Sequence, residues 1–201
     1  RRDASFRQAS VAEVASVLAN RAPANPQDLA SLVLDHLRII ENQLRGDDTN
    51  GLKLFRRDDG KTPKSENDCR DALIQRLRGP LLPLGVHIEK EAQAAHDTRP
   101  DMRAQFMEPG HRLRVPIELK KEGHRELWSA WRTQLRPYTL DPECDGVGIY
   151  LVLWFGIEPR PSPEGIRPST PQQLTDLLRA MIPEEDRRRI HVVVVDLSIP
   201  N

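Results

Sequence analysis

Apolar residues recur at helical spacing in two segments near the start of the chain. The first pattern spans residues 11–18 and the second spans 29–40, where Pro26 is placed to occupy the first turn of the helix. The stretch 46–64 that follows is rich in Gly, Asp and basic residues, which is typical of a loop. We therefore predict a helical extension and a loop over residues 1–63.

A third helical pattern begins after Ser65, which is followed three positions later by Asp68, as in a capping box. The apolar spacing continues over residues 66–78. Gly79 and Pro80 come next and should stop the helix, because proline cannot donate the hydrogen bond that continues it.

The remaining chain contains five apolar stretches of strand length and two more helical patterns. The turn sequence MEPGH should join the second and third strands into a hairpin. Strands are expected at residues 85–93, 99–106, 112–121, 147–155 and 190–197, and helices at 126–138 and 171–182. This order over residues 64–201 predicts an α/β fold, a three-layer α/β/α sandwich with a mixed central sheet.

The composition narrows the range of functions. Thirty basic and thirty acidic residues give zero net charge, so nucleic-acid binding would need a local basic patch. The two cysteines lie far apart, which predicts no disulfide framework and favours a reducing cytoplasm. No apolar run reaches the roughly 18 residues of a membrane span, and no signal peptide is visible. Since the first residue is Arg, we expect a fragment of a longer protein with further domains.

Charged residues end the strand at 112–121, which finishes with Glu118, Lys120 and Lys121. Residues two apart in a strand point to the same face, so Glu118 and Lys120 project together. The hairpin would bring Asp101 beside Glu118. Two carboxylates so close are unfavourable unless a cation compensates them, and hard divalent cations bind oxygen ligands. These residues therefore predict a metal site, although a solvated strand end would explain the same charges.

A Pro-Asp pair ending at Asp101, followed by the Glu-Leu-Lys run from Glu118 to Lys120, resembles the signature of the PD-(D/E)XK nuclease superfamily. The resemblance covers about residues 64–198 and implies the restriction-endonuclease-like fold. It also implies that Asp101 and Glu118 bind Mg²⁺ or Mn²⁺ and that Lys120 assists the attacking water or the scissile phosphate. We expect the main-chain carbonyl of Leu119 as a further metal ligand.

Three more residues fit the same interpretation. Glu66 lies on the apolar face of its helix and resembles the accessory acidic ligand of the superfamily, although the helix dipole also favours an acid in the first turn. Gln134 and Tyr138 are one helical turn apart and resemble the Q-xxx-Y element of some nucleases of this fold. A hydrogen-bonded polar pair in the core is the alternative, and Trp128 and Trp131 are assigned to packing.

Basic residues surround these positions in the sequence, as phosphate binding would require. They are Arg99, Arg103, Arg112, Arg114, Lys121, Arg125, Arg132 and Arg136. The motifs of other chemistries are missing. Gly60-Lys61-Thr62 lacks the first glycine of a nucleotide-binding P-loop, and the histidines lack the spacing of zinc ligands. The G-x-S-x-G sequence of a serine hydrolase does not occur.

These observations predict a Mg²⁺- or Mn²⁺-dependent phosphodiesterase, a deoxyribonuclease with RNA as the second substrate to consider. Cleavage of both strands of a duplex would call for a homodimer. The resemblance places such a domain in a larger prokaryotic defence or DNA-processing protein. The alternative is a non-catalytic module of the same fold that binds protein or nucleic acid, with the first two helices as its docking surface.

Overall fold

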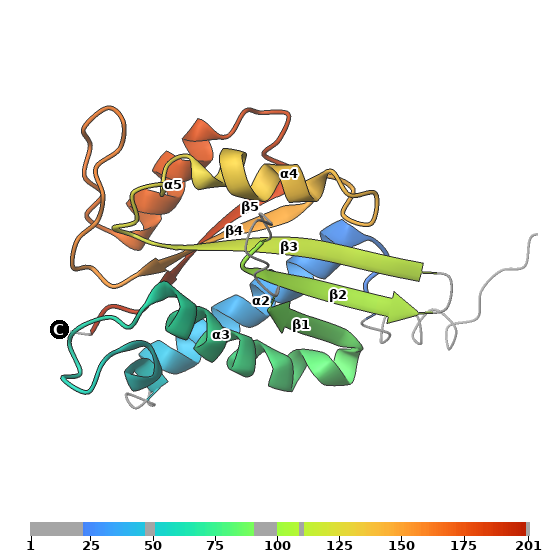
Figure 1. The fold of residues 1–201 in the computed structure, drawn as a ribbon, viewed down its shortest axis with the longest axis horizontal. Helices are drawn as coiled ribbons and strands as arrows, with labels where there is room; N and C mark the ends of the chain where they lie inside the picture. Colours follow the sequence, from blue (N-terminus) through green and yellow to red (C-terminus); the bar gives the residue numbers. More distant parts are fainter. Residues whose placement is uncertain (1–21, 47–50, 91–99, 109–110, 200–201) are drawn as a thin grey trace, which may run out of the picture.

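A five-stranded mixed sheet forms the centre of the computed structural model, which describes residues 22–46, 51–90, 100–108 and 111–199 (Figure 1). The strands follow one another across the sheet in chain order, the first three antiparallel and the last three parallel. They are β1 (Val86–Lys90), β2 (Met102–Glu108), β3 (His111–Lys121), β4 (Gly148–Trp154) and β5 (Ile190–Asp196). The predicted α/β class and the β2–β3 hairpin are confirmed, whereas the helix predicted at 11–18 lies outside the described residues.

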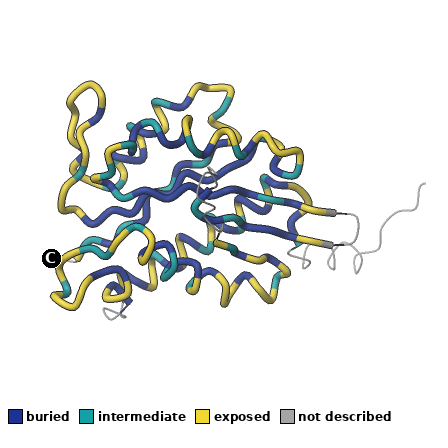
Figure 2. The backbone as a smooth tube through the Cα atoms, in the orientation of Figure 1, coloured by how far each residue is buried: buried dark blue, intermediate teal, exposed yellow. Residues whose placement is uncertain are grey.

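Helices lie against both faces of this sheet (Figure 1). They are α2 (Pro26–Arg45), α3 (Glu66–Leu81), α4 (Arg136–Thr139) and α5 (Pro171–Met181), with a π-helix at Trp131–Leu135. Alternate residues of β4 enter two separate hydrophobic clusters, because successive strand residues point to opposite faces. One cluster contains α2 and α3, and the other contains α5 and the segment around Trp131. Figure 2 shows the buried strands between helices whose outer surfaces are exposed.

The second predicted helix is confirmed as α2. Asn25 caps its first turn by accepting a hydrogen bond from the Asp28 N–H at 2.9 Å, and Pro26 occupies the first helical position. The apolar stripe, including Leu29, Val33 and Leu37, is fully buried in the same cluster as α3. The division of the chain at residue 63 stays a prediction. No helix in the described parts of the chain has the length and apolar character to cross a membrane.

Two expectations about helix ends and loops are corrected. Helix α3 passes through Pro80 to Leu81, since proline in the last turn removes only one hydrogen bond, and the chain turns away at Gly85 with φ of 73°. The predicted loop at 46–64 contains the 3₁₀ helix Gly51–Phe55, which buries Phe55 in the core.

The helix predicted at 126–138 is only partly present. Residues 126–129 form turns, and the π-helix that follows gives way to α4 at Arg136, whose N–H donates to the Trp131 carbonyl five residues earlier. Pro137 has no N–H to continue a regular ladder, which accounts for the change of helix type here.

Candidate functional site

Glu118 and Lys120 lie near the carboxyl end of β3, on one face of the sheet. Glu118 is opposite Tyr150 and Lys120 is opposite Val152 in the parallel pairing with β4. Both side chains are buried, with 3% and 4% of their surface exposed. A solvated strand end is therefore excluded, and the burial of two charged groups requires partners within the protein.

The Lys120 ammonium lies at the centre of a group of carboxylates. Its Nζ is 2.5 Å from Glu118 Oε1, 3.6 Å from Asp101 Oδ2 and 3.7 Å from Glu66 Oε1. It also donates to the Leu119 carbonyl at 3.1 Å. The four residues predicted as metal ligands therefore all lie around the nitrogen atom of the predicted lysine. They are Glu66, Asp101, Glu118 and Leu119. We call Glu66, Asp101, Glu118 and Lys120 the carboxylate cluster.

Main-chain hydrogen bonds hold the two remote carboxylates in place. Asp101 comes directly before β2, whose first residue pairs with Ile117, and its Oδ2 accepts from the Leu119 N–H at 2.9 Å. Glu66 is the first residue of α3, and its Oε2 accepts from the Lys121 N–H at 3.1 Å. Asp101 thus uses the same oxygen to accept from the backbone of β3 and to face Lys120, whereas Glu66 uses one oxygen for each.

The cluster shifts the protonation of its buried members. Burial and the neighbouring Asp101 raise the pKa of Glu118 to about 8, against the opposing effect of the Lys120 ammonium. Burial acts to lower the pKa of Lys120, but the charges of Glu118 and Asp101 outweigh it and raise the pKa above its usual value. The lysine therefore stays protonated at neutral pH. Glu118, with a pKa of about 8, is the member of the cluster whose charge changes near neutral pH.

The donor set suits a hard cation, but the ammonium lies in its midst. Three carboxylates and the Leu119 carbonyl offer the oxygen ligands that Mg²⁺ prefers. Among the described residues, however, no three acidic, His or Cys side chains are placed so that they could hold a metal ion. Lys120 is the cation that compensates these acids here, so a divalent ion would need the ammonium to swing aside.

Gln134 and Tyr138, the predicted Q-xxx-Y pair, lie in two different helical segments. Gln134 lies in the π-helix and donates its amide to Glu126 Oε2 at 2.7 Å rather than to Lys120. Tyr138 lies in α4 and is partly exposed. Because the predicted regular helix is interrupted, its spacing does not fix where these side chains point.

Several of the basic residues near the site are already ion-paired. Arg114 lies 2.7 Å from Glu143, Arg103 lies 3.6 Å from Glu89, and Arg136 lies 3.3 Å from Asp186. These pairs reduce the positive potential that the sequence suggested. Arg99 lies outside the described residues.

Sequence reasoning missed two buried charged residues beside the cluster. Arg70, 3% exposed, places a guanidinium nitrogen 4.0 Å from Asp101 Oδ1; its position four residues after Glu66, on the same helix face, was the available signal. Glu122 follows the Lys-Lys pair and accepts hydrogen bonds from four consecutive backbone N–H groups of the chain after β4, those of Phe155, Gly156, Ile157 and Glu158.

Two cavities lie along the edge of the sheet beside the carboxylate cluster. One of about 410 Å³ is lined by Lys121, Glu122 and His124 together with Phe155 and Ile157. His124 Nδ1 accepts from the Glu126 N–H at 3.1 Å, which leaves Nε2 to carry the ring proton in the neutral form. We call this space the proximal cavity, because Lys121 adjoins Lys120.

Residues 29–157 match the model of a family described as a domain of unknown function, DUF8371. The match covers more than half of the chain and includes every residue of the carboxylate cluster, so the chain belongs to this family. No curated protein and no solved structure matches the chain.

Proposed function

We propose that this protein is a metal-dependent nuclease of the PD-(D/E)XK type that hydrolyses phosphodiester bonds, with DNA as its substrate. The observation that carries the proposal is the meeting of Glu66, Asp101 and Glu118 within 3.7 Å of the Lys120 nitrogen. Structural ion pairs seldom gather three acids around one buried base, because the acids repel one another. Shifted pKa values at such clusters are typical of catalytic sites.

The arrangement of elements also supports this proposal. The order helix, three antiparallel strands, helix, parallel strand, with helices on both faces, agrees with the restriction-endonuclease-like sandwich that the resemblance implies. The acidic residues come from the start of α3, the residue before β2 and the end of β3, which agrees with the positions that the resemblance implies.

In the proposed reaction, Asp101, Glu118 and the Leu119 carbonyl would hold Mg²⁺ or Mn²⁺, with Glu66 as an accessory carboxylate. A bound divalent cation would lower the pKa of water and neutralise charge on the phosphate. Lys120, kept protonated by its acidic neighbours, would donate hydrogen bonds to the attacking water or to the phosphate oxygen that gains charge. Asp101 and Glu66, held by the backbone of β3, would keep this geometry fixed when Lys120 moves.

A non-catalytic binding module is the second candidate. The close contact between Lys120 and Glu118 favours it, since a closed ion pair satisfies both groups without a metal. The docking surface expected on the second helix counts against it, because the apolar face of α2 is buried within the domain itself.

Cleavage assays with plasmid DNA, linear DNA and single-stranded RNA in Mg²⁺ or Mn²⁺ test the proposal. We expect Glu118→Ala and Lys120→Ala each to reduce the cleavage rate at least 100-fold, roughly the loss found for one electrostatic catalytic group. The exposed Glu164→Ala and Lys53→Ala serve as matched controls and should retain activity. Cleavage at the normal rate by the folded double variant Glu118→Ala/Lys120→Ala would refute the proposal.

A further inference from the structure

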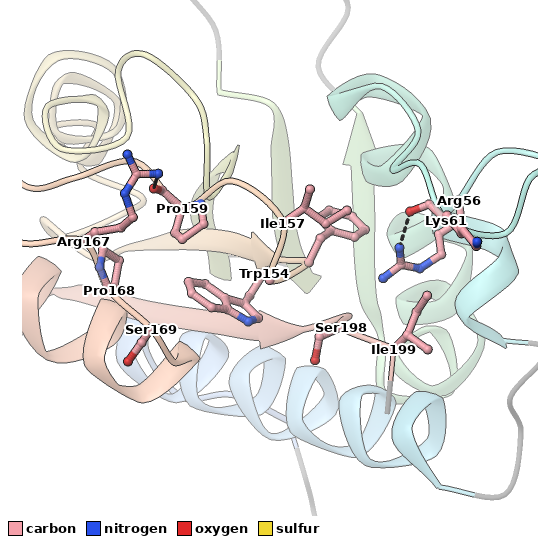
Figure 3. A pocket seen from close by; sticks show the side chains of 12 residues that line it. Arg56, Lys61, Trp154, Ile157, Pro159, Arg167, Pro168, Ser169, Ser198 and Ile199 are labelled. Atoms are coloured by element: carbon pink, nitrogen blue, oxygen red, sulfur yellow. Dashed lines mark hydrogen bonds between the residues drawn. The ribbon is translucent and has the colours of Figure 1, made fainter. Parts of the chain in front are cut away.

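A second cavity of about 690 Å³ lies at the carboxyl ends of β4 and β5, and we call it the distal cavity. Arg56 and Lys61 line it from the chain before α3, Arg167 from the loop after β4, and Ser198 from the segment after β5. Figure 3 shows the Trp154 ring between Arg167 on one side and Arg56 on the other. Separate chain segments therefore bring basic side chains to one hollow.

The charged residues that line the distal cavity are all basic. Its lining residues include Arg56, Lys61 and Arg167 but no Asp or Glu, whereas the proximal cavity has Glu122 and Glu158 in its wall. Among the described residues, none of the three cations has a carboxylate within the 4.0 Å of an ion pair. A cavity whose charged lining is only basic attracts an anion.

Arg56 is the buried member of this basic group. Its side chain is 3% exposed, and its guanidinium donates to the Lys61 and Leu197 carbonyls and lies 5.4 Å from the centre of the Phe155 ring. Its buried Nε has no hydrogen-bond partner among the described residues. The carboxylates of Glu122 and Asp59 act on this charge, but among the described residues neither forms an ion pair with it. An anion in the distal cavity would give Arg56 a direct partner.

The two cavities adjoin along the carboxyl edge of the sheet. Phe155 and Ile157 line both of them, and Lys121, beside the carboxylate cluster, lines the proximal one. The cluster is at the end of β3 and the distal cavity at the ends of β4 and β5, which is about 5–10 Å away at the usual strand spacing. A nucleic-acid strand that follows this edge past the cluster would therefore pass the distal cavity.

We propose that the distal cavity binds a phosphate group of the same nucleic-acid strand whose scissile bond lies at the carboxylate cluster, and that this strand is unpaired there. The inference depends on the proposed function. An unpaired strand can follow a basic groove past aromatic side chains, and Trp154 and Phe155 line this cavity beside the basic residues. Arg167 and Lys61, both exposed, contact the phosphate, and buried Arg56 contributes its charge.

Fluorescence anisotropy with a labelled single-stranded oligonucleotide, in EDTA to prevent cleavage, tests this proposal. The variant Arg167→Ala/Lys61→Ala should bind about tenfold more weakly, as expected when charge-assisted hydrogen bonds are removed. The slope of log K against log salt should become shallower by about 0.7 for each phosphate that the variant no longer neutralises. Arg38→Ala/Lys53→Ala removes the same charge from exposed positions outside the cavity and should change neither quantity.

Equal binding and equal salt slopes in the cavity variant and the control variant would overturn the proposal. An equal loss of affinity for a duplex of the same sequence would overturn its single-strand part. Calorimetric titration with adenosine monophosphate separates a strand from a free nucleotide: mononucleotide binding that needs Arg167, without any change in oligonucleotide binding, also refutes it. Since these measurements need no catalysis, their outcome is independent of whether Glu118→Ala abolishes cleavage.

Discussion

Glu118 and Glu122 are four residues apart, and each is 3% exposed, yet their carboxylates have opposite surroundings. Glu118 faces Asp101 and Glu66 across the Lys120 ammonium, and burial beside Asp101 raises its pKa to about 8. Glu122 is surrounded by donors instead, with four backbone N–H groups directed at its two oxygens.

The difference separates a carboxylate held by fixed backbone donors from one placed among competing acids. Backbone donors cannot move away or change their charge, so Glu122 holds residues 155–158 in one conformation, and these residues include Phe155 and Ile157 between the two cavities. The acids around Lys120 repel one another, and they are compensated by the Lys120 ammonium and, at Asp101, by the Arg70 guanidinium. Binding of another cation would therefore lower the free energy of the acids around Lys120. It would not do so for Glu122, whose oxygens are already bound by N–H donors.

The largest expected effect comes from removal of Glu122. Glu122→Ala leaves four N–H groups without their acceptor and should lower the free energy of unfolding by about 3 kcal/mol, since each buried unsatisfied group costs about 1–3 kcal/mol and part of this loop can reach water. Urea unfolding measures this value. The exposed Glu164→Ala is the control, and equal stability of the two variants would show that the loop does not depend on Glu122.

Metal binding should give the next largest effect. A divalent ion that binds only the folded protein raises the free energy of unfolding by about 2.7 kcal/mol at a concentration one hundred times its Kd. We expect Mn²⁺ to raise the melting temperature of the wild type and to lose this effect in Asp101→Asn. Glu143→Gln, which changes a carboxylate paired with Arg114 away from the cluster, should keep it. An equal shift in Asp101→Asn would place the ion elsewhere.

The pH dependence of stability sharpens the comparison further. Because the folded-state pKa of Glu118 lies near 8 and its usual value is 4.5, the folded protein keeps a proton that the unfolded chain releases between these values. Its contribution to stability is therefore fully present below pH 4.5 and is lost as pH rises towards 8. His191, whose pKa is lowered by burial, acts in the opposite direction below its usual value of 6.5.

Glu118→Gln isolates this contribution from that of the histidine. Unfolding by urea in EDTA, measured from pH 5 to pH 8.5, should show that the difference in stability between the variant and the wild type changes steadily in favour of the variant as pH rises. A constant difference for Glu118→Gln would mean that Lys120 fully compensates the ionised acid.

The smallest expected effect belongs to a carboxylate in water. Asp35 and Arg38 in α2 form an ion pair at 3.1 Å, and both side chains are about two-thirds exposed, at 65% and 66%. Asp35→Ala should change the free energy of unfolding by about 0.3–0.5 kcal/mol or less, because solvent screens the pair. If Asp35→Ala lowered the free energy of unfolding as much as Glu122→Ala does, burial would not be what determines how much these contacts stabilise the fold.

Much of the fold followed from local patterns. The apolar stripe of α2 and the continuous apolar run of β4 predicted a helix and a doubly buried strand, and both are present. The prediction was wrong at 126–138, where helical spacing did not show that Pro137 and a π-helix would break the regular ladder. Hydrophobic spacing records which face is buried, but it does not record where hydrogen-bond register changes.

The sequence by itself determined that Glu118 and Lys120 share a face, because strand residues alternate, and that Glu66 lies on the inner side of its helix. Only the tertiary structure decided that Lys120 lies among three acids, that Arg70 joins Asp101, and that Glu122 receives four N–H groups from a segment more than thirty residues away. Alternation and helical spacing are properties of a few neighbouring residues. Distances between side chains from different elements depend on how the whole sheet and its helices pack, and no local pattern contains that information.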